Sequence, residues 1–179
     1  RNARGQNFFV QHGEADTLIP VAESRTMVQA VRALDIPIEY YEHPNASHYI
    51  YWEKDCYQRA WSWVKQFTLN RSPHQISHIA YSLNYATAFW LTIRQFQHWG
   101  TPATVEAHVA DDGSRLDIET SNVAIVEVDT NTCPLRRANR YQVTTGGRAL
   151  VLPALPDGRI IVQVGRQPQP AGDWPPMKR

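Results

Sequence analysis

The sequence of 179 residues is poor in cysteine and has no long apolar run. Its two cysteines, Cys56 and Cys133, lie far apart, so they do not form the closely spaced cluster that holds a structural zinc ion. No stretch approaches the roughly 20 apolar residues of a membrane-spanning helix. Two interpretations of the cysteines stay open: two buried free thiols, or one disulfide if the protein is exported.

A charge excess of either sign is also absent. The 18 lysines and arginines nearly balance the 17 aspartates and glutamates, and the pI is about 8.0. This balance gives no reason to expect binding to nucleic acid or to a membrane surface through charge. The sequence is instead 42% hydrophobic and 11% aromatic, which suits one large domain or two small ones.

The amino-terminal part has the pattern of a strand, a helix and a second strand. An apolar run at 8–10 predicts a strand that ends at Gly13, and Pro20 suits the first turn of a helix over 21–34. Residues 36–41 are rich in aromatic and β-branched side chains and predict the second strand. The apolar positions of the helix share one face: Val21, Val28, Val31 and Leu34.

A loop with a titratable side chain follows each strand. Asp16 lies in the first loop and His48 in the second. A right-handed crossover would make the strands parallel neighbours, so both loops would leave the same edge of the sheet. We therefore expect Asp16 and His48 to lie within hydrogen-bonding reach, as the last two members of a triad in the chain order Ser, Asp, His.

The segment HGEADTLIPVAESRTMVQAVRALDIPIEYYEHPNASH, residues 12–48, carries a resemblance. It is similar to the end of the catalytic domain of α/β-hydrolase serine hydrolases, nearest to the prolyl-oligopeptidase-like peptidases and esterases. The resemblance implies that Asp16 is the triad acid and His48 the base of an ester- or peptide-hydrolysing enzyme. We expect no cofactor and no metal ion.

The nucleophile of that family is missing from this sequence. The family places it in a GxSxG turn upstream of the acid, and no GxSxG occurs in the 179 residues. We therefore expect the carboxyl-terminal portion of a serine hydrolase, with the nucleophile on an upstream segment or a second chain, a small ester or peptide as substrate, and possible homo-oligomers. The alternative is a non-catalytic binding or structural subunit that keeps a remnant hydrolase scaffold.

The segment 49–69 predicts a strongly amphipathic helix. Its apolar residues recur at intervals of three and four: Trp52, Cys56, Ala60, Trp63, Val64 and Phe67. A substrate platform of aromatic side chains is the functional alternative, but helical spacing favours packing on the sheet.

The composition changes at the breaker cluster 70–73. Beyond it, apolar and polar residues alternate in short stretches separated by turn signals, which predicts an antiparallel β-sandwich, immunoglobulin-like in outline, over 74–166. This region also resembles the accessory β-domain of some secreted bacterial members of the family. The expected fold class is thus α/β followed by all-β: a hydrolase portion over 1–70, the sandwich, and a Pro-rich tail over 167–179. The expected strands are 76–85, 87–96, 104–110, 115–120, 123–129, 140–144, 148–152 and 159–164.

Four other histidines and a serine invite functional interpretations. His43 is a rival base, although it stands at the strand end, too early to fold back over the acid. His12 suits a structural hydrogen bond. His74 and His78 have the spacing of a metal pair on a helix, but the surrounding alternation favours a strand or loop. Ser47 lacks the strained turn of a nucleophile.

Overall fold

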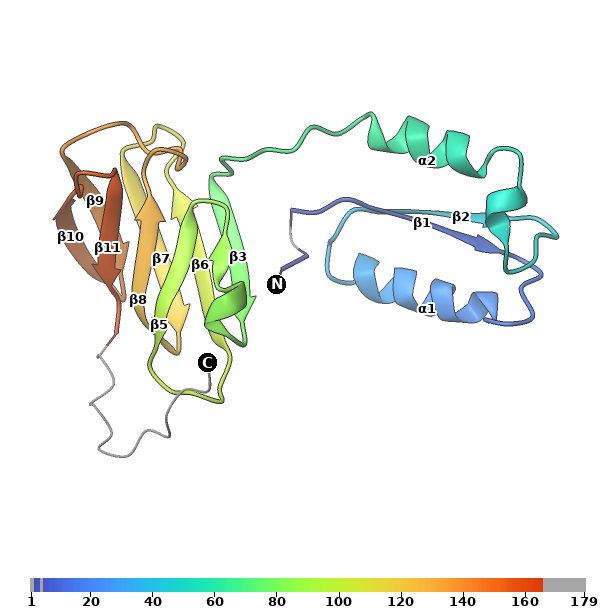
Figure 1. Cartoon of the computed structure of the whole chain (residues 1–179), viewed down its shortest axis with the longest axis horizontal. Coiled ribbons are helices and arrows are strands. Elements are labelled where there is room, and N and C mark those ends of the chain that lie inside the picture. The colour runs from blue at the N-terminus through green and yellow to red at the C-terminus, as the bar shows by residue number, and fades with distance from the viewer. Residues whose placement is uncertain (1, 4, 166–179) are drawn as a thin grey trace. The chain divides into compact units, whose positions relative to one another are not determined.

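The computed structural model describes residues 2, 3 and 5–165 (Figure 1). Its contacts divide the chain into two units, one over Ala3–Leu69 and one that takes the residues from Asn70 onward. We call them the Asp–His unit and the β unit. The expected tail, 167–179, lies outside the described residues.

The Asp–His unit is built on two parallel strands. Its elements are β1 (Phe8–Gly13), α1 (Val21–Arg32), β2 (Ile38–His43), the 3₁₀ turn η1 (Ile50–Trp52) and α2 (Cys56–Val64). β1 and β2 pair in parallel, from Phe8 opposite Ile38 to Gly13 opposite His43. The helices α1 and α2 lie on opposite faces of the strand pair (Figure 1).

Helix α1 covers one face and is shorter than predicted. It begins after Pro20 and buries Val28, whose exposed fraction is 2%. Leu34, expected on the buried face, is 66% exposed, because the helix ends at Arg32 and the chain leaves its axis. A bidentate ion pair with N–O distances of 2.7 and 2.6 Å joins Arg25 of the helix to Glu42 of β2.

The predicted packing of the aromatic helix is wrong in large part. Of the residues in α2 only Cys56 is buried, while Tyr57 and Trp61 are 70% and 62% exposed. Trp63 does turn inward and stacks on Phe9 of β1 with ring centroids 5.5 Å apart. A sheet of two strands offers too little apolar surface to cover every aromatic ring on the helix.

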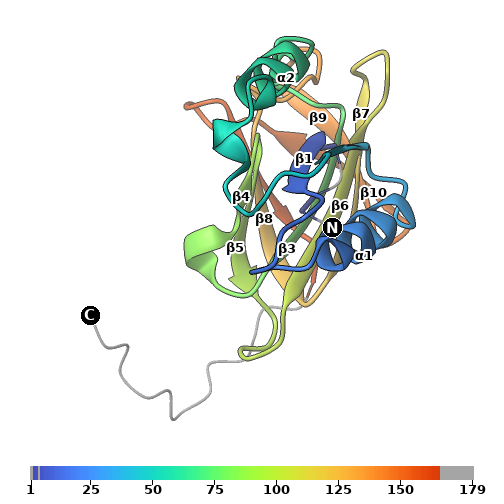
Figure 2. The ribbon, with the colours of Figure 1, turned by 90° about the vertical axis from the view of Figure 1, so that its right-hand side faces the viewer.

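The β unit has two sheets. One has the strand order β10-β9-β7-β6-β3 and the other β11-β8-β5-β4. Figures 1 and 2 show β5 and β8 in one layer and β6 and β7 in the other. The strands are β3 (Gln75–Ala80), β4 (Thr87–Ala88), β5 (Leu91–Phe96), β6 (Ala103–Val109), β7 (Arg115–Ser121), β8 (Val123–Asp129), β9 (Arg140–Thr145), β10 (Arg148–Pro153) and β11 (Arg159–Gln163); the 3₁₀ turn η2 (Leu83–Tyr85) replaces the end of the first predicted strand.

One apolar core joins the two sheets. Inward positions of the strands alternate with outward ones, as in β6 and β8, and the inward side chains are buried. Trp90 is 1% exposed, and its indole nitrogen donates a hydrogen bond to the carbonyl oxygen of Pro73 at 2.8 Å. The pairing is antiparallel except between β7 and β9, which are parallel, so the expectation of a wholly antiparallel sandwich is wrong at that pair.

The expected α/β-hydrolase fold class is wrong for this chain. The described residues are 39% strand and 17% helix, with two α-helices and three sheets, and the wholly parallel sheet has two strands. An α/β-hydrolase fold needs a core of parallel strands covered by helices. Helical periodicity in this sequence is confined to the Asp–His unit, and the longer remainder alternates, so the chain is mostly β.

Among the described residues, no helix has the length and apolar character needed to cross a membrane.

Candidate active site

Asp16 and His48 lie in the two loops that leave the carboxyl ends of β1 and β2. Because the strands are parallel and in register, Gly13 and His43 end them side by side. The structure brings the two loop side chains together: Nδ1 of His48 lies 2.9 Å from Oδ2 of Asp16.

Gly13 allows the two loops to approach this closely. A Cβ atom on Gly13 would overlap the backbone carbonyl oxygens of Ser47 and Ala46. The amide of Ala15 donates to the carbonyl of Ala46 at 2.9 Å, which ties one loop to the other. The absence of a Cβ atom at Gly13 therefore lets the two loops come close enough for Asp16 and His48 to meet.

The carboxylate of Asp16 is buried and fully engaged. Its side chain is 2% exposed, and Oδ1 accepts hydrogen bonds from the amides of Leu18 and Ile19 at 2.8 and 2.9 Å. Burial by itself would raise the pKa of Asp16. The hydrogen bonds from the Ile19 amide, the His48 ring and the Leu18 amide outweigh burial and lower the pKa to about 2. Asp16 is therefore a carboxylate at any physiological pH.

The ring of His48 is oriented by this carboxylate. An ionised Asp16 can only accept, so Nδ1 of His48 carries the hydrogen and a neutral ring has its lone pair on Nε2. The side chain is 37% exposed, and the ring of Tyr49 packs edge-on against it at 5.3 Å. A half-exposed imidazole held this way can take a proton from a nucleophile.

His12 lies beside the pair, which the sequence did not indicate. Its Nδ1 lies 2.6 Å from Oγ of Ser24, and its Nε2 lies 3.0 Å from the carbonyl oxygen of Ile19 and 3.1 Å from Oδ2 of Asp16. The structural hydrogen bond expected of His12 is present. Its closeness to Asp16 depends on the path of the loop, for which no sequence signal was available.

The ring of His43, the rival base, contacts Gln11 and Asp55. The residue is 2% exposed, and its Nε2 lies 2.8 Å from the side-chain oxygen of Gln11. Its Nδ1 lies 3.7 Å from Oδ1 of Asp55. These contacts make His43 a buried residue of the strand end.

The two histidines considered as a metal pair, and the two cysteines, have contacts typical of residues that support the fold. The rings of His74 and His78 contact the carbonyl oxygens of Val109 and Tyr85, and His78 lies on strand β3. No group of three or more His, Cys, Asp or Glu residues that could hold a metal ion occurs among the described residues. Cys56 and Cys133 are both free and buried.

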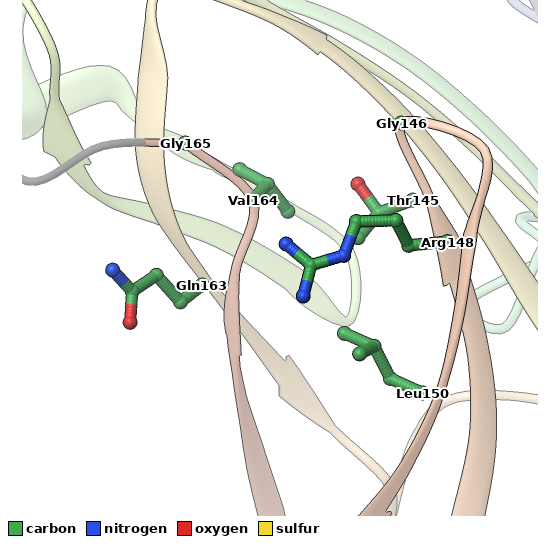
Figure 3. Close-up of a pocket in the computed structure, with 7 residues that line it drawn as sticks. All are labelled: Thr145, Gly146, Arg148, Leu150, Gln163, Val164 and Gly165. Carbon is green, nitrogen blue, oxygen red and sulfur yellow. The ribbon is translucent and has the colours of Figure 1, made fainter.

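A pocket of about 630 Å³ lies in the β unit, between the β9–β10 hairpin and the end of β11 (Figure 3). The guanidinium of Arg148 points into it toward Val164, whereas the amide of Gln163 points away. The lining has no aspartate, glutamate, histidine or cysteine. It therefore offers no acid–base pair comparable to Asp16 and His48. Its lining residues are Thr145, Gly146, Arg148, Leu150, Gln163, Val164 and Gly165.

Comparison of the chain with protein-family models, with curated proteins and with solved structures finds no match. The resemblance of residues 12–48 to serine hydrolases therefore stays a prediction from the sequence.

Proposed function

We propose that this chain contributes the acid, Asp16, and the base, His48, of a serine hydrolase that cleaves an ester or peptide bond. The nucleophilic serine would come from residues other than these 179, on an upstream segment or a second chain.

The hydrogen bond between Nδ1 of His48 and Oδ2 of Asp16, 2.9 Å long, is the observation that carries the proposal. A buried carboxylate on Nδ1 fixes the ring and its tautomer, and the lone pair on Nε2 is then available to a hydroxyl group. The low pKa of Asp16, about 2, keeps the carboxylate charged while the ring is protonated.

The chemistry follows from those two roles. His48 would take the proton of the serine hydroxyl through Nε2 as the oxygen attacks the substrate carbonyl, and Asp16 would stabilise the resulting imidazolium. His48 would then give the proton to the leaving alcohol or amine. A water molecule, deprotonated by the same ring, would hydrolyse the acyl-enzyme and release the acid.

A fluorophosphonate probe, which labels activated serines, tests this proposal. The chain is purified from its native source with its associated material, and labelled bands are sequenced. We expect label on a GxSxG serine that belongs to the same protein or co-purifies with it. In recombinant material His48→Ala should reduce the labelling rate by about 10³-fold or more.

His98→Ala is the matched control, since His98 is an exposed histidine of the β unit. It should label at the wild-type rate. Label that is independent of His48, or material that binds no probe in any form, would refute the hydrolase and favour the binding or structural subunit.

A further inference from the structure

His12 is a part-buried histidine beside Asp16 that the proposed mechanism does not use. It stands one residue before Gly13 near the end of β1, and its side chain is 12% exposed. Both ring nitrogens have partners: Ser24 on one side, Ile19 and Asp16 on the other.

The partners fix the tautomer of His12. Nε2 lies 3.0 Å from the carbonyl oxygen of Ile19 and 3.1 Å from a carboxylate oxygen of Asp16, and both of these atoms are acceptors. Nε2 must therefore carry a hydrogen, which it donates to Ile19. In the neutral ring Nδ1 accepts from the hydroxyl of Ser24, at 2.6 Å, so the ring is held from both ends.

Ile19 connects His12 to the triad acid. Its carbonyl oxygen accepts from His12, and its amide donates to Oδ1 of Asp16 at 2.9 Å. The residue that orients one carboxylate oxygen is thus itself anchored by the His12 ring. The other carboxylate oxygen, Oδ2, which receives His48, also lies beside the positive end of the His12 N–H bond.

We propose that His12 is a positioning residue for the acid–base pair, and that Ser24 of helix α1 locks its ring in place. His12 holds the loop of Asp16 through Ile19 and so fixes the direction in which Oδ2 meets His48. Its effect on catalysis rests on the proposed function, whereas its effect on the geometry of the pair does not.

Nuclear magnetic resonance of the whole chain, with ¹⁵N-labelled histidines, tests the geometric part. We expect hydrogen on Nε2 of His12 and on Nδ1 of His48. His12→Leu removes the anchor, so exchange of the His48 Nδ1 hydrogen with water should become about tenfold faster, the effect of losing about one net hydrogen bond. His12→Gln can still donate to Ile19 and should restore slow exchange.

Two further variants keep the test decisive. Ser24→Ala removes one partner of the His12 ring, so it should also make the exchange faster, by a smaller factor. It replaces His12→Leu in the test if that variant does not fold. His43→Leu removes a buried histidine of the same strand pair whose ring contacts Gln11 and Asp55. That variant should leave the exchange of the His48 hydrogen unchanged.

The catalytic part is measured in the protein that carries the GxSxG serine. The rate of fluorophosphonate labelling should fall about 10- to 100-fold in His12→Leu, since small displacements of catalytic groups cost up to about 100-fold, and His12→Gln should recover most of it. Unchanged exchange in His12→Leu, or equal losses in the Leu and Gln variants, would overturn the positioning role.

Other outcomes separate the two proposals. Label on Ser24 of this chain would make His12 a base and would also overturn its positioning role. A labelling rate that does not change in His48→Ala would refute the proposed function instead. The exchange measurement would still decide the role of His12.

Discussion

At the scale of single residues, the pair depends on how Asp16 is held. Two backbone amides and the His48 ring donate hydrogen bonds to a carboxylate that is almost fully buried. Their combined hydrogen bonds lower the pKa of Asp16 to about 2, against an ordinary value of 3.8. The same bonds that orient the acid thus also couple the stability of the fold to pH.

Asp16→Asn tests this coupling. A carboxyl group whose pKa is lower in the folded protein stabilises it fully above pH 3.8, and this contribution is lost as the pH falls from 3.8 through about 2. The difference in unfolding free energy between the wild type and Asp16→Asn should therefore shrink steadily below about pH 4, as Asp16 takes up its proton. Urea unfolding at a series of pH values measures it. A difference that does not vary with pH would contradict the account.

Gly13→Ala tests the close approach of the two loops. The added methyl group would overlap the carbonyl oxygens of Ser47 and Ala46, so we expect a loss of about 1–3 kcal/mol and separation of His48 from Asp16. Thermal unfolding and the His48 Nδ1 hydrogen signal measure the two effects. In Gly100→Ala, the control, a Cβ meets nothing within 4 Å and the cost is backbone strain alone, at a φ of +80°. An intact signal in Gly13→Ala would contradict this role of Gly13.

The sequence was sufficient to predict that Asp16 and His48 lie within hydrogen-bonding reach of each other, but not to predict the residues around them. Asp16 and His48 could be found because parallel strands bring their carboxyl-end loops to one edge. The contact of His12 with Asp16 depends on the path of the loop from Glu14 to Ile19. That path is set by several hydrogen bonds at once and has no periodic signal.

At the scale of elements, the alternation of side chains was the reliable guide. It located most strands of the β unit, and it could not predict that β7 and β9 pair in parallel, because pairing partners depend on the whole sheet. Helix ends were less predictable. α1 ends at Arg32, two residues before Leu34, where the apolar pattern ends.

Asn122 is the residue at which the chain passes from one sheet of the β unit to the other, between β7 and β8. It has a φ of 58°, and its side chain bonds the amide and carbonyl of His98 and the carbonyl of Thr101 at 2.7, 2.9 and 2.8 Å. Asn122→Ala should cost about 2–4 kcal/mol through the lost bonds and the left-handed backbone.

The urea midpoint of the β unit measures this cost, and Asn122→Gly is the matched variant. Glycine loses the side-chain bonds but tolerates the positive φ, so it should be less destabilising than alanine by about 1 kcal/mol. Two variants of equal stability would show that the backbone at this corner is unstrained.

At the scale of the whole molecule, the division into two units explains why the predicted fold class was wrong. The Asp–His unit has the order strand, Asp16 loop, helix, strand and His48 loop from which the hydrolase fold was predicted, and yet most of the chain is β structure. A local motif of 37 residues does not determine the class of a chain of 179.

Trp90→Ala tests the independence of the units. The indole is 1% exposed in the core of the β unit, and its removal should destabilise that unit by about 3–5 kcal/mol. The Asp–His unit has its own contacts, so the His48 Nδ1 hydrogen signal should persist at urea concentrations that unfold the β unit. Simultaneous loss of both signals would show one cooperative structure.

The central claim is that Asp16 and His48 act as one acid–base pair, and a double-mutant cycle on the labelling rate tests it most directly. Residues that act as a unit give non-additive losses. We predict that Asp16→Ala combined with His48→Ala labels no more slowly than His48→Ala alone, in the protein that carries the serine. Losses that multiply in the double variant would mean that the two residues act separately, and would contradict the account.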